Sequence, residues 1–160
     1  MLQSFGLIRT NLLHENIYKR PSFYAVQHMI NLLNDSVQQA GYLKHETLTP
    51  REISISGIKA RGQVGGFIWF SDKIPSDKLD WEKVDITIKD ITIANPVYVD
   101  VITGKVYELL KHNVKKIGKD LRIRDLPVWD SPMLLIDKSA LTLKALSSES
   151  GNLSETQGIL

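Results

Sequence analysis

The stretch VDITIK, residues 84–89, alternates strictly between apolar and polar side chains. Successive side chains of a strand point to opposite faces of a sheet, so this pattern predicts a strand with one buried face and one polar face. The stretch VYVDV, residues 97–101, repeats the alternation, and Thr103-Gly104 then gives a turn signal before residues 105–109. We therefore predict a β-hairpin there.

Further short apolar or alternating runs lie on both sides of these strands. They are ISIS at 53–56, GFIWF at 66–70, LRIR at 121–124 and MLLI at 133–136. Prolines fall between the runs, where a sheet tolerates them. Six to eight short strands separated by turn signals predict a mainly β protein built as an antiparallel β-sandwich.

The N-terminal part has a different pattern. FGLI at 5–8 is typical of a buried strand, residues 11–20 are mixed and polar like a loop, and Pro21 can open a helix. We predict an amphipathic helix over 22–40, ended by Gly41. Its apolar stripe consists of Phe23, Val26, Met29, Ile30, Leu33 and Val37.

These patterns divide the chain into three parts. Residues 1–41 hold the strand, loop and helix, residues 42–146 form the sandwich domain, and residues 147–160 are rich in Ser, Glu and Gly. We expect that last part to be disordered, because it has too few apolar side chains to bury.

Composition excludes several classes of function. The 160 residues carry a net charge of +2 and no cysteine, which excludes disulfides, thiolate nucleophiles and zinc–thiolate sites. The densest basic run, residues 111–119, is typical of a solvated turn, so we expect no nucleic-acid partner. Neither a signal peptide nor an apolar run of membrane-spanning length is found, and we expect no membrane partner.

Short motifs resemble the C-terminal part of (β/α)8-barrel glycoside hydrolases. GLIRTN at 6–11 and KRPSFYAVQ at 19–27 look like the last barrel strand and last helix of that superfamily. NPVYVD at 95–100, TGKVY at 103–107 and LPVWDSP at 126–132 resemble the small β-sandwich that follows the barrel in such enzymes. The resemblance covers roughly residues 5–143 and rests on the order of the motifs.

The resemblance implies a fold and a role. A barrel-type strand and one amphipathic helix would precede an accessory sandwich, which would support a catalytic barrel present in cis in a longer protein or in trans. Glycosidases use two carboxylates, which the family pattern places upstream of residue 1, so we assign no catalytic residue, metal or cofactor to this chain. The helix over 22–40, without a barrel wall, would lead to self-association.

Three residues are candidates for carbohydrate contact. His14 and Glu15 follow the barrel-type strand, in the loop that would lie at the catalytic face of a barrel. Trp81 is flanked by Asp80 and Glu82 and is the best candidate for an exposed ring on which a sugar could stack. For all three, an ordinary exposed loop pair or an edge-covering Trp is the simpler interpretation, as core packing is for Trp69 and half-buried packing for Trp129.

Other chemistries fit less well. The four histidines lack helical metal-site spacing, Ser56-Gly57 lacks a nucleophile elbow, and Gly62, Gly65 and Gly66 indicate a hairpin turn better than a phosphate loop. Two alternatives to the accessory role stay open. One is a carbohydrate-binding module, which needs a row of exposed aromatic rings, and the other is a non-enzymatic interaction domain.

Overall fold

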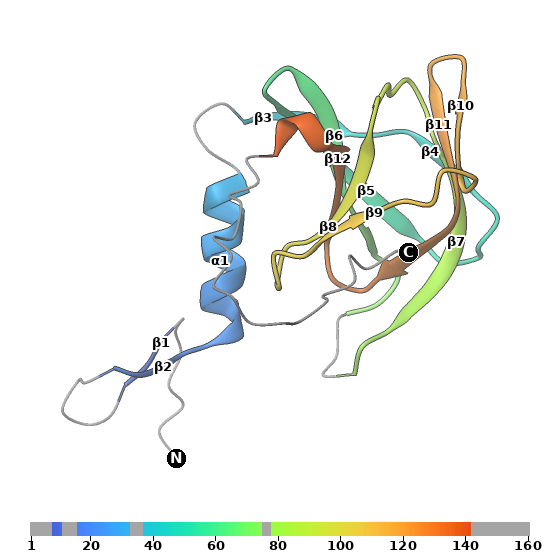
Figure 1. The fold of residues 1–160 in the computed structure, drawn as a ribbon. Coiled ribbons are helices and arrows are strands. Elements are labelled where there is room, and N and C mark those ends of the chain that lie inside the picture. The colour runs from blue at the N-terminus through green and yellow to red at the C-terminus, as the bar shows by residue number, and fades with distance from the viewer. Residues whose placement is uncertain (1–7, 11–15, 33–36, 75–77, 142–160) are drawn as a thin grey trace, which may run out of the picture.

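A computed structural model describes residues 8–10, 16–32, 37–74 and 78–141 (Figure 1). Its strands form a six-stranded, a four-stranded and a two-stranded sheet, all antiparallel. In spatial order the six-stranded sheet contains β3 (Gln38–Tyr42), β5 (Ile53–Ala60), β6 (Gln63–Phe70), β12 (Met133–Asp137), β8 (Pro96–Asp100) and β9 (Val106–Glu108). The four-stranded sheet contains β10 (Val114–Ile117), β11 (Asp120–Trp129), β7 (Trp81–Ile88) and β4 (His45–Thr47). The protein is therefore mainly β and sandwich-like, as predicted.

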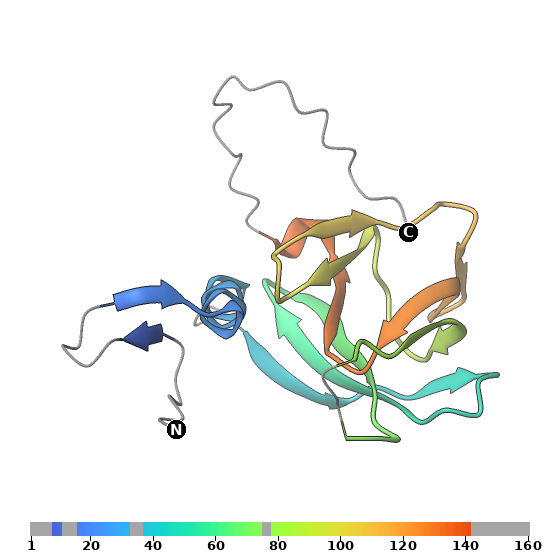
Figure 2. The ribbon, with the colours of Figure 1, turned by 90° about the horizontal axis from the view of Figure 1, so that it is seen from below.

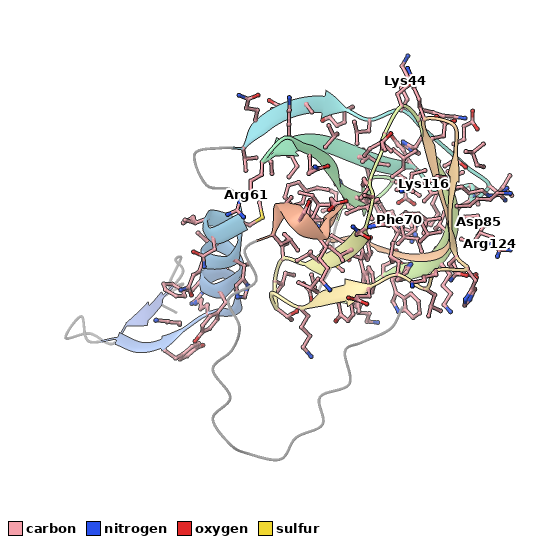
Figure 3. All side chains as sticks on the ribbon, turned by 45° about the horizontal axis from the view of Figure 1, so that its top comes forward. Lys44, Arg61, Phe70, Asp85, Lys116 and Arg124 are labelled. Carbon is pink, nitrogen blue, oxygen red and sulfur yellow. The ribbon has the colours of Figure 1, made fainter. Side chains whose placement is uncertain are left out.

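The main core lies between the two large sheets. Val84, Ile86 and Ile88 of β7 are buried in it, whereas the polar residues between them are only partly buried. The alternation at 84–89 is thus confirmed as a strand with one buried face. Phe70 enters the same core from β6, as Figure 3 shows.

Strand β12 is buried on both of its faces. Met133 and Leu135 lie in the core between the sheets, and Leu134 and Ile136 belong to a second apolar cluster on the opposite face of the six-stranded sheet. Because β12 pairs with β6 on one side and β8 on the other, its polar backbone groups are also satisfied. A continuous apolar run is what such a central strand requires.

The second cluster is covered by helix α1 (Pro21–Leu32) and the 3-10 turn η1 (Lys138–Ala140). Met29 of α1 and the buried Ala140 of η1 pack against the cluster. The His28 ring lies over the turn between β8 and β9, where its Nδ1 is 3.2 Å from the carbonyl oxygen of Val101 and 3.1 Å from that of Ile102. Gly104 makes this contact possible, since a Cβ there would come within 2.9 Å of the imidazole.

Part of the N-terminal prediction is wrong. The helix is described only to Leu32, and residues 38–41, predicted as its last turn and its stop, belong to the edge strand β3. All five residues of β3 are exposed, so its place comes from backbone pairing with β5 and not from an apolar face. The six-stranded sheet consequently begins at Gln38, before the predicted boundary at 42.

Of the barrel-type strand predicted over 5–8, residues 5–7 lie outside the described residues, and Ile8 begins a strand with an antiparallel partner. β1 (Ile8–Thr10) pairs antiparallel with β2 (Asn16–Lys19), a segment predicted as loop. This small hairpin lies beyond α1, on the side away from the sandwich (Figures 1 and 2). The predicted disordered tail, 147–160, lies outside the described residues.

The turn predictions are confirmed in part. β8 and β9 form the predicted hairpin around Thr103-Gly104. Gly62, with φ of 79°, occupies the turn between β5 and β6, but Gly65 and Gly66 lie inside β6. A Cβ at Gly65 would lie 2.6 Å from the carbonyl oxygen of Leu135, so glycine there permits close approach of β6 and β12.

Among the described residues, no helix has the length and apolar character needed to cross a membrane.

A matched pair of leucine variants tests the core assignment. Leu135 is fully buried in β12, and Leu48 is 89% exposed. Leu135→Ala should lower the free energy of unfolding by about 2–5 kcal/mol, because it removes buried contacts and leaves a cavity. Leu48→Ala should change it by less than about 0.5 kcal/mol. Urea unfolding measures both, and similar shifts of the two midpoints would contradict the fold.

Candidate functional site

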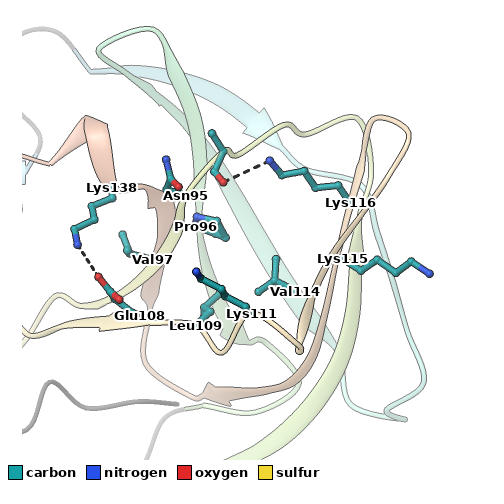
Figure 4. A pocket seen from close by; sticks show the side chains of 11 residues that line it. Asn95, Pro96, Val97, Glu108, Leu109, Lys111, Val114, Lys115, Lys116 and Lys138 are labelled. Atoms are coloured by element: carbon teal, nitrogen blue, oxygen red, sulfur yellow. Dashed lines mark hydrogen bonds and ion pairs between the residues drawn. The ribbon is translucent and has the colours of Figure 1, made fainter.

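A hollow on the described surface lies where the edges of the two sheets meet. It is an open groove of about 650 Å³ between β9, the edge of the six-stranded sheet, and β10, the edge of the four-stranded sheet (Figure 4). Its lining comes from residues 94–97, 108–109, 111, 114–116 and Lys138. Three regions of the chain, 94–97, 108–116 and Lys138, thus build it.

The groove has an aliphatic floor and a basic rim. Its charged lining residues are Lys111, Lys115, Lys116, Lys138 and Glu108, a surplus of positive charge. The Lys138 amino group lies 2.6 Å from a Glu108 carboxylate oxygen, and the Lys116 amino group donates to the Ala94 carbonyl oxygen at 3.4 Å. Lys138, through a direct hydrogen bond, and the nearby Lys111 hold the pKa of Glu108 below its usual value. Glu108 is therefore a counter-ion and not a proton donor.

One wall of the groove is fixed by a buried carboxylate. Asp137, at the end of β12, is only 2% exposed. It accepts hydrogen bonds from the backbone N–H groups of Ala94 and Asn95, both at 2.8 Å, and from the N–H and hydroxyl of Ser139 at 2.9 and 2.7 Å. Burial tends to raise the pKa of Asp137, but these hydrogen bonds outweigh it and the pKa is lowered.

The exposed ring predicted for Trp81 is found at the start of β7, with half of its surface exposed. Trp81 stacks on Trp129 of β11 with ring centroids 6.1 Å apart, and Trp129 lies 6.2 Å from the ring of the buried Tyr98. This row of rings runs from the surface into the core, so it offers one exposed ring and not a flat platform. Trp69, predicted as core, is half-buried against the second cluster.

The other two predicted contact residues, His14 and Glu15, lie outside the described residues. Among the residues that are described, no group of three or more His, Cys, Asp or Glu side chains is placed to hold a metal ion. His28, His45 and His112 lie on separate elements.

The tightest described cluster of carboxylates surrounds an arginine. Arg51 lies over the Phe70 ring at 3.6 Å and contacts Asp72 at 2.9 Å and Asp80 at 3.0 Å. The hydrogen bond from Arg51 lowers the pKa of Asp72, whereas a general acid at neutral pH needs a raised one. The cluster therefore joins loops at one end of the sandwich and does not resemble a glycosidase pair.

Comparisons with known proteins give no assignment: no family model, no curated protein and no solved structure matches the chain. The groove is the site that sequence reasoning missed. Its signal was the basic run 111–119, which was interpreted as a solvated turn. That run meets residues 94–97 and Lys138 only through the sandwich topology.

The Asp137 hydrogen bonds give a testable pH dependence. Because the folded pKa lies below the unfolded value of about 3.9, the stabilisation is present above that pH and is lost as pH falls through the folded pKa. Asp137→Asn should lower the free energy of unfolding at neutral pH by about 1–3 kcal/mol, since the amide cannot accept all four hydrogen bonds.

The measurement is urea unfolding between neutral pH and pH 2. The destabilisation by Asp137→Asn should shrink towards the acid end. The control is Asp90→Asn on an exposed turn, where Asn tolerates the positive φ of 52°. An equal loss of unfolding free energy from both substitutions at neutral pH would show that the hydrogen bonds of Asp137 do not stabilise the fold.

Proposed function

We propose that this chain is the accessory β-sandwich of a glycoside hydrolase, and that it supports a catalytic barrel through helix α1. The observation that carries the proposal is that α1 has apolar side chains on two sides. Met29 packs on the sandwich, while Val26 and Ile30 remain 40% and 65% exposed. A helix placed between two packed bodies needs such a double face.

The uncovered side of α1 forms a continuous apolar surface, here called the outer stripe. It consists of Phe23, Val26 and Ile30, which recur at spacings of three and four residues. Tyr24 beside it is 45% exposed, and Tyr18 of the neighbouring hairpin is 47% exposed. Burying such side chains stabilises an interface by up to about 1.5–3 kcal/mol each. The resemblance of residues 19–27 to the last helix of a barrel supports a barrel wall as the occupant.

The role in this proposal is structural. Among the described carboxylates, Asp72 and Asp80 pair with Arg51, Glu108 pairs with Lys138, and Asp137 is the clamp. We assign this chain no acid/base and nucleophile pair at the spacing of about 5 Å that retaining glycosidases use. Both catalytic carboxylates would come from the barrel. The sandwich would hold the barrel's last helix in place.

Charged substitutions on the outer stripe test the docking surface. Val26→Glu with Ile30→Glu should make the chain more monomeric in size-exclusion chromatography and reduce binding of a hydrophobic dye, because the exposed apolar surface is lost. The melting temperature should stay within a few degrees of the parent, since Met29 and His28 still hold α1. The matched control is Gln27→Glu with Asn31→Glu, which adds the same charge to exposed polar positions of the same helix.

Two results would contradict the docking surface. A large loss of stability in the Val26/Ile30 variant would show that these side chains serve the sandwich itself. Equal dye binding and equal association in the two double variants would show that the outer stripe is not an adhesive surface.

The chain alone should not cleave glycosides. We expect no turnover of aryl glycosides by the purified protein, because both catalytic carboxylates would lie in the barrel. Reading the coding DNA directly upstream of residue 1 tests the origin of the barrel, which should appear there in the same or a shifted frame. Turnover by the purified chain that Glu15→Gln abolishes would overturn the proposal.

The carbohydrate-binding alternative rests on Trp81. A half-exposed indole can stack on one sugar ring, but a module of that kind needs several exposed rings in a row. Trp129 and Tyr98 continue the row inward and not along the surface. The alternative would gain if Trp81→Ala kept the fold and removed retention on a neutral polysaccharide gel.

A further inference from the structure

We propose that the basic groove between β9 and β10 binds an acidic polysaccharide, namely a linear chain of sugars that carries uronate carboxylates. This site is separate from the outer stripe of α1. The anionic character of the ligand follows from the groove itself. The choice of a carbohydrate rests on the proposed function.

The lysines that line the groove differ in whether a carboxylate already neutralises their charge. The charge of Lys138 is used by Glu108, at 2.6 Å. Figure 4 shows the side chain of Lys111 extending over the middle of the groove, with Lys116 at its far end. Lys116 has no carboxylate partner among the described residues and donates only a long hydrogen bond to the Ala94 carbonyl. Lys111 and Lys116 therefore leave positive charge for an incoming anion.

The basic surface continues around β10. A second hollow of about 260 Å³ lies next to the groove and is lined by His112, Asn113, Lys115, Arg122 and Arg124. Lys115 lines both hollows, and Figure 4 shows its side chain extending away from the groove. Lys116 and Arg124 lie on the same β10–β11 side of the sandwich (Figure 3). Two hollows joined by one lysine fit a chain of anions better than a single small ion.

Two acidic residues on this side of the sandwich already have cationic partners. Asp85 lies 3.8 Å from Arg122, and Asp120 lies 3.2 Å from Lys89. Arg124 donates to the His112 carbonyl oxygen at 3.0 Å, which fixes the loop between the two hollows. Several positive charges along a concave surface attract a polyanion and raise its rate of association.

The lining favours sugars over nucleic acid. Neither hollow is lined by Phe, Tyr or Trp, and proteins that bind single-stranded nucleic acids stack the bases on aromatic rings. The floor of the groove is made instead of Pro96, Val97, Leu109 and Val114, whose aliphatic groups can contact the C–H faces of sugar rings. Carboxylates at regular intervals would then pair with Lys111 and Lys116.

The test is binding of three probes to the full chain at low salt, measured by calorimetry. They are a galacturonate hexamer, the same hexamer with methyl-esterified carboxyls, and a single-stranded DNA hexamer. We expect the free-acid hexamer to bind most tightly, and its affinity to fall as salt screens the charges. Lys111→Gln with Lys116→Gln should weaken it roughly tenfold, the loss of two exposed ion pairs.

The matched control is Lys59→Gln with Lys105→Gln, two exposed lysines outside both hollows, which should leave the affinity unchanged. Chemical-shift mapping on the unsubstituted chain is the second measurement and does not depend on a variant folding. The free-acid hexamer should shift the amide signals of Asn95, Leu109 and Val114.

Each remaining outcome overturns the proposal. Equal binding of the methyl ester would exclude charge recognition, and tighter binding of the DNA hexamer would assign the surface to nucleic acid. Equal losses of affinity for the free-acid hexamer in the two double-lysine variants would show that binding depends only on the overall charge. If none of the three probes bound, the groove would not be a site for an acidic polysaccharide. All these results are independent of the Val26 and Ile30 variants, so failure of this site and failure of barrel docking can be told apart.

Discussion

The arrangement of the molecule depends on strand β12, because its side chains are apolar on both faces. Each face must therefore pack against another element to be shielded from water. One face is covered by the four-stranded sheet, which closes the core around Met133 and Leu135. The other face carries Leu134 and Ile136, and none of the described sheets lies over it. Helix α1 and the turn η1 take that place. The helix is therefore part of the sandwich and not merely attached to it.

The same strand also positions the groove. Asp137 ends β12, and its carboxylate holds the backbone at Ala94 and Asn95 before β8 begins. Lys138 follows directly and forms the ion pair with Glu108 of β9. The apolar run of β12 fixes the register of this strand. The residues at its end, Asp137 and Lys138, then shape one wall of the groove and contribute to its charge. Core packing and the chemistry of the candidate site share one segment of the chain.

The sequence predicted the strands whose side chains alternate, and the reason is physical. At 84–89 and 97–101 one face meets the core, so burial imposes a period of two on the residues themselves. β3 could not be found in this way, because QQAGY has no buried face and is held by backbone pairing with β5. The residues of β3 were instead assigned to the polar side of the helix predicted over 22–40. The hairpin of β1 and β2 was missed for a similar reason, since residues 16–19, NIYK, place two apolar side chains next to each other and give no alternation of hydrophobicity.

The groove could not be predicted from the sequence, because its lining comes from three regions of the chain, 94–97, 108–116 and Lys138, whose meeting depends on strand order. Trp81 could be predicted as exposed from its charged neighbours, but its stacking on Trp129 depends on the register of β7 and β11. The position of α1 has a further consequence. A helix that covers the sandwich with Met29 and presents Val26 and Ile30 outward couples the two bodies that it touches. Any partner seated on the outer stripe would stabilise α1, and through it the second cluster and β12. Because β12 continues into Asp137 and Lys138, such a partner would also stiffen the wall of the basic groove, although the groove lies on another side of the sandwich.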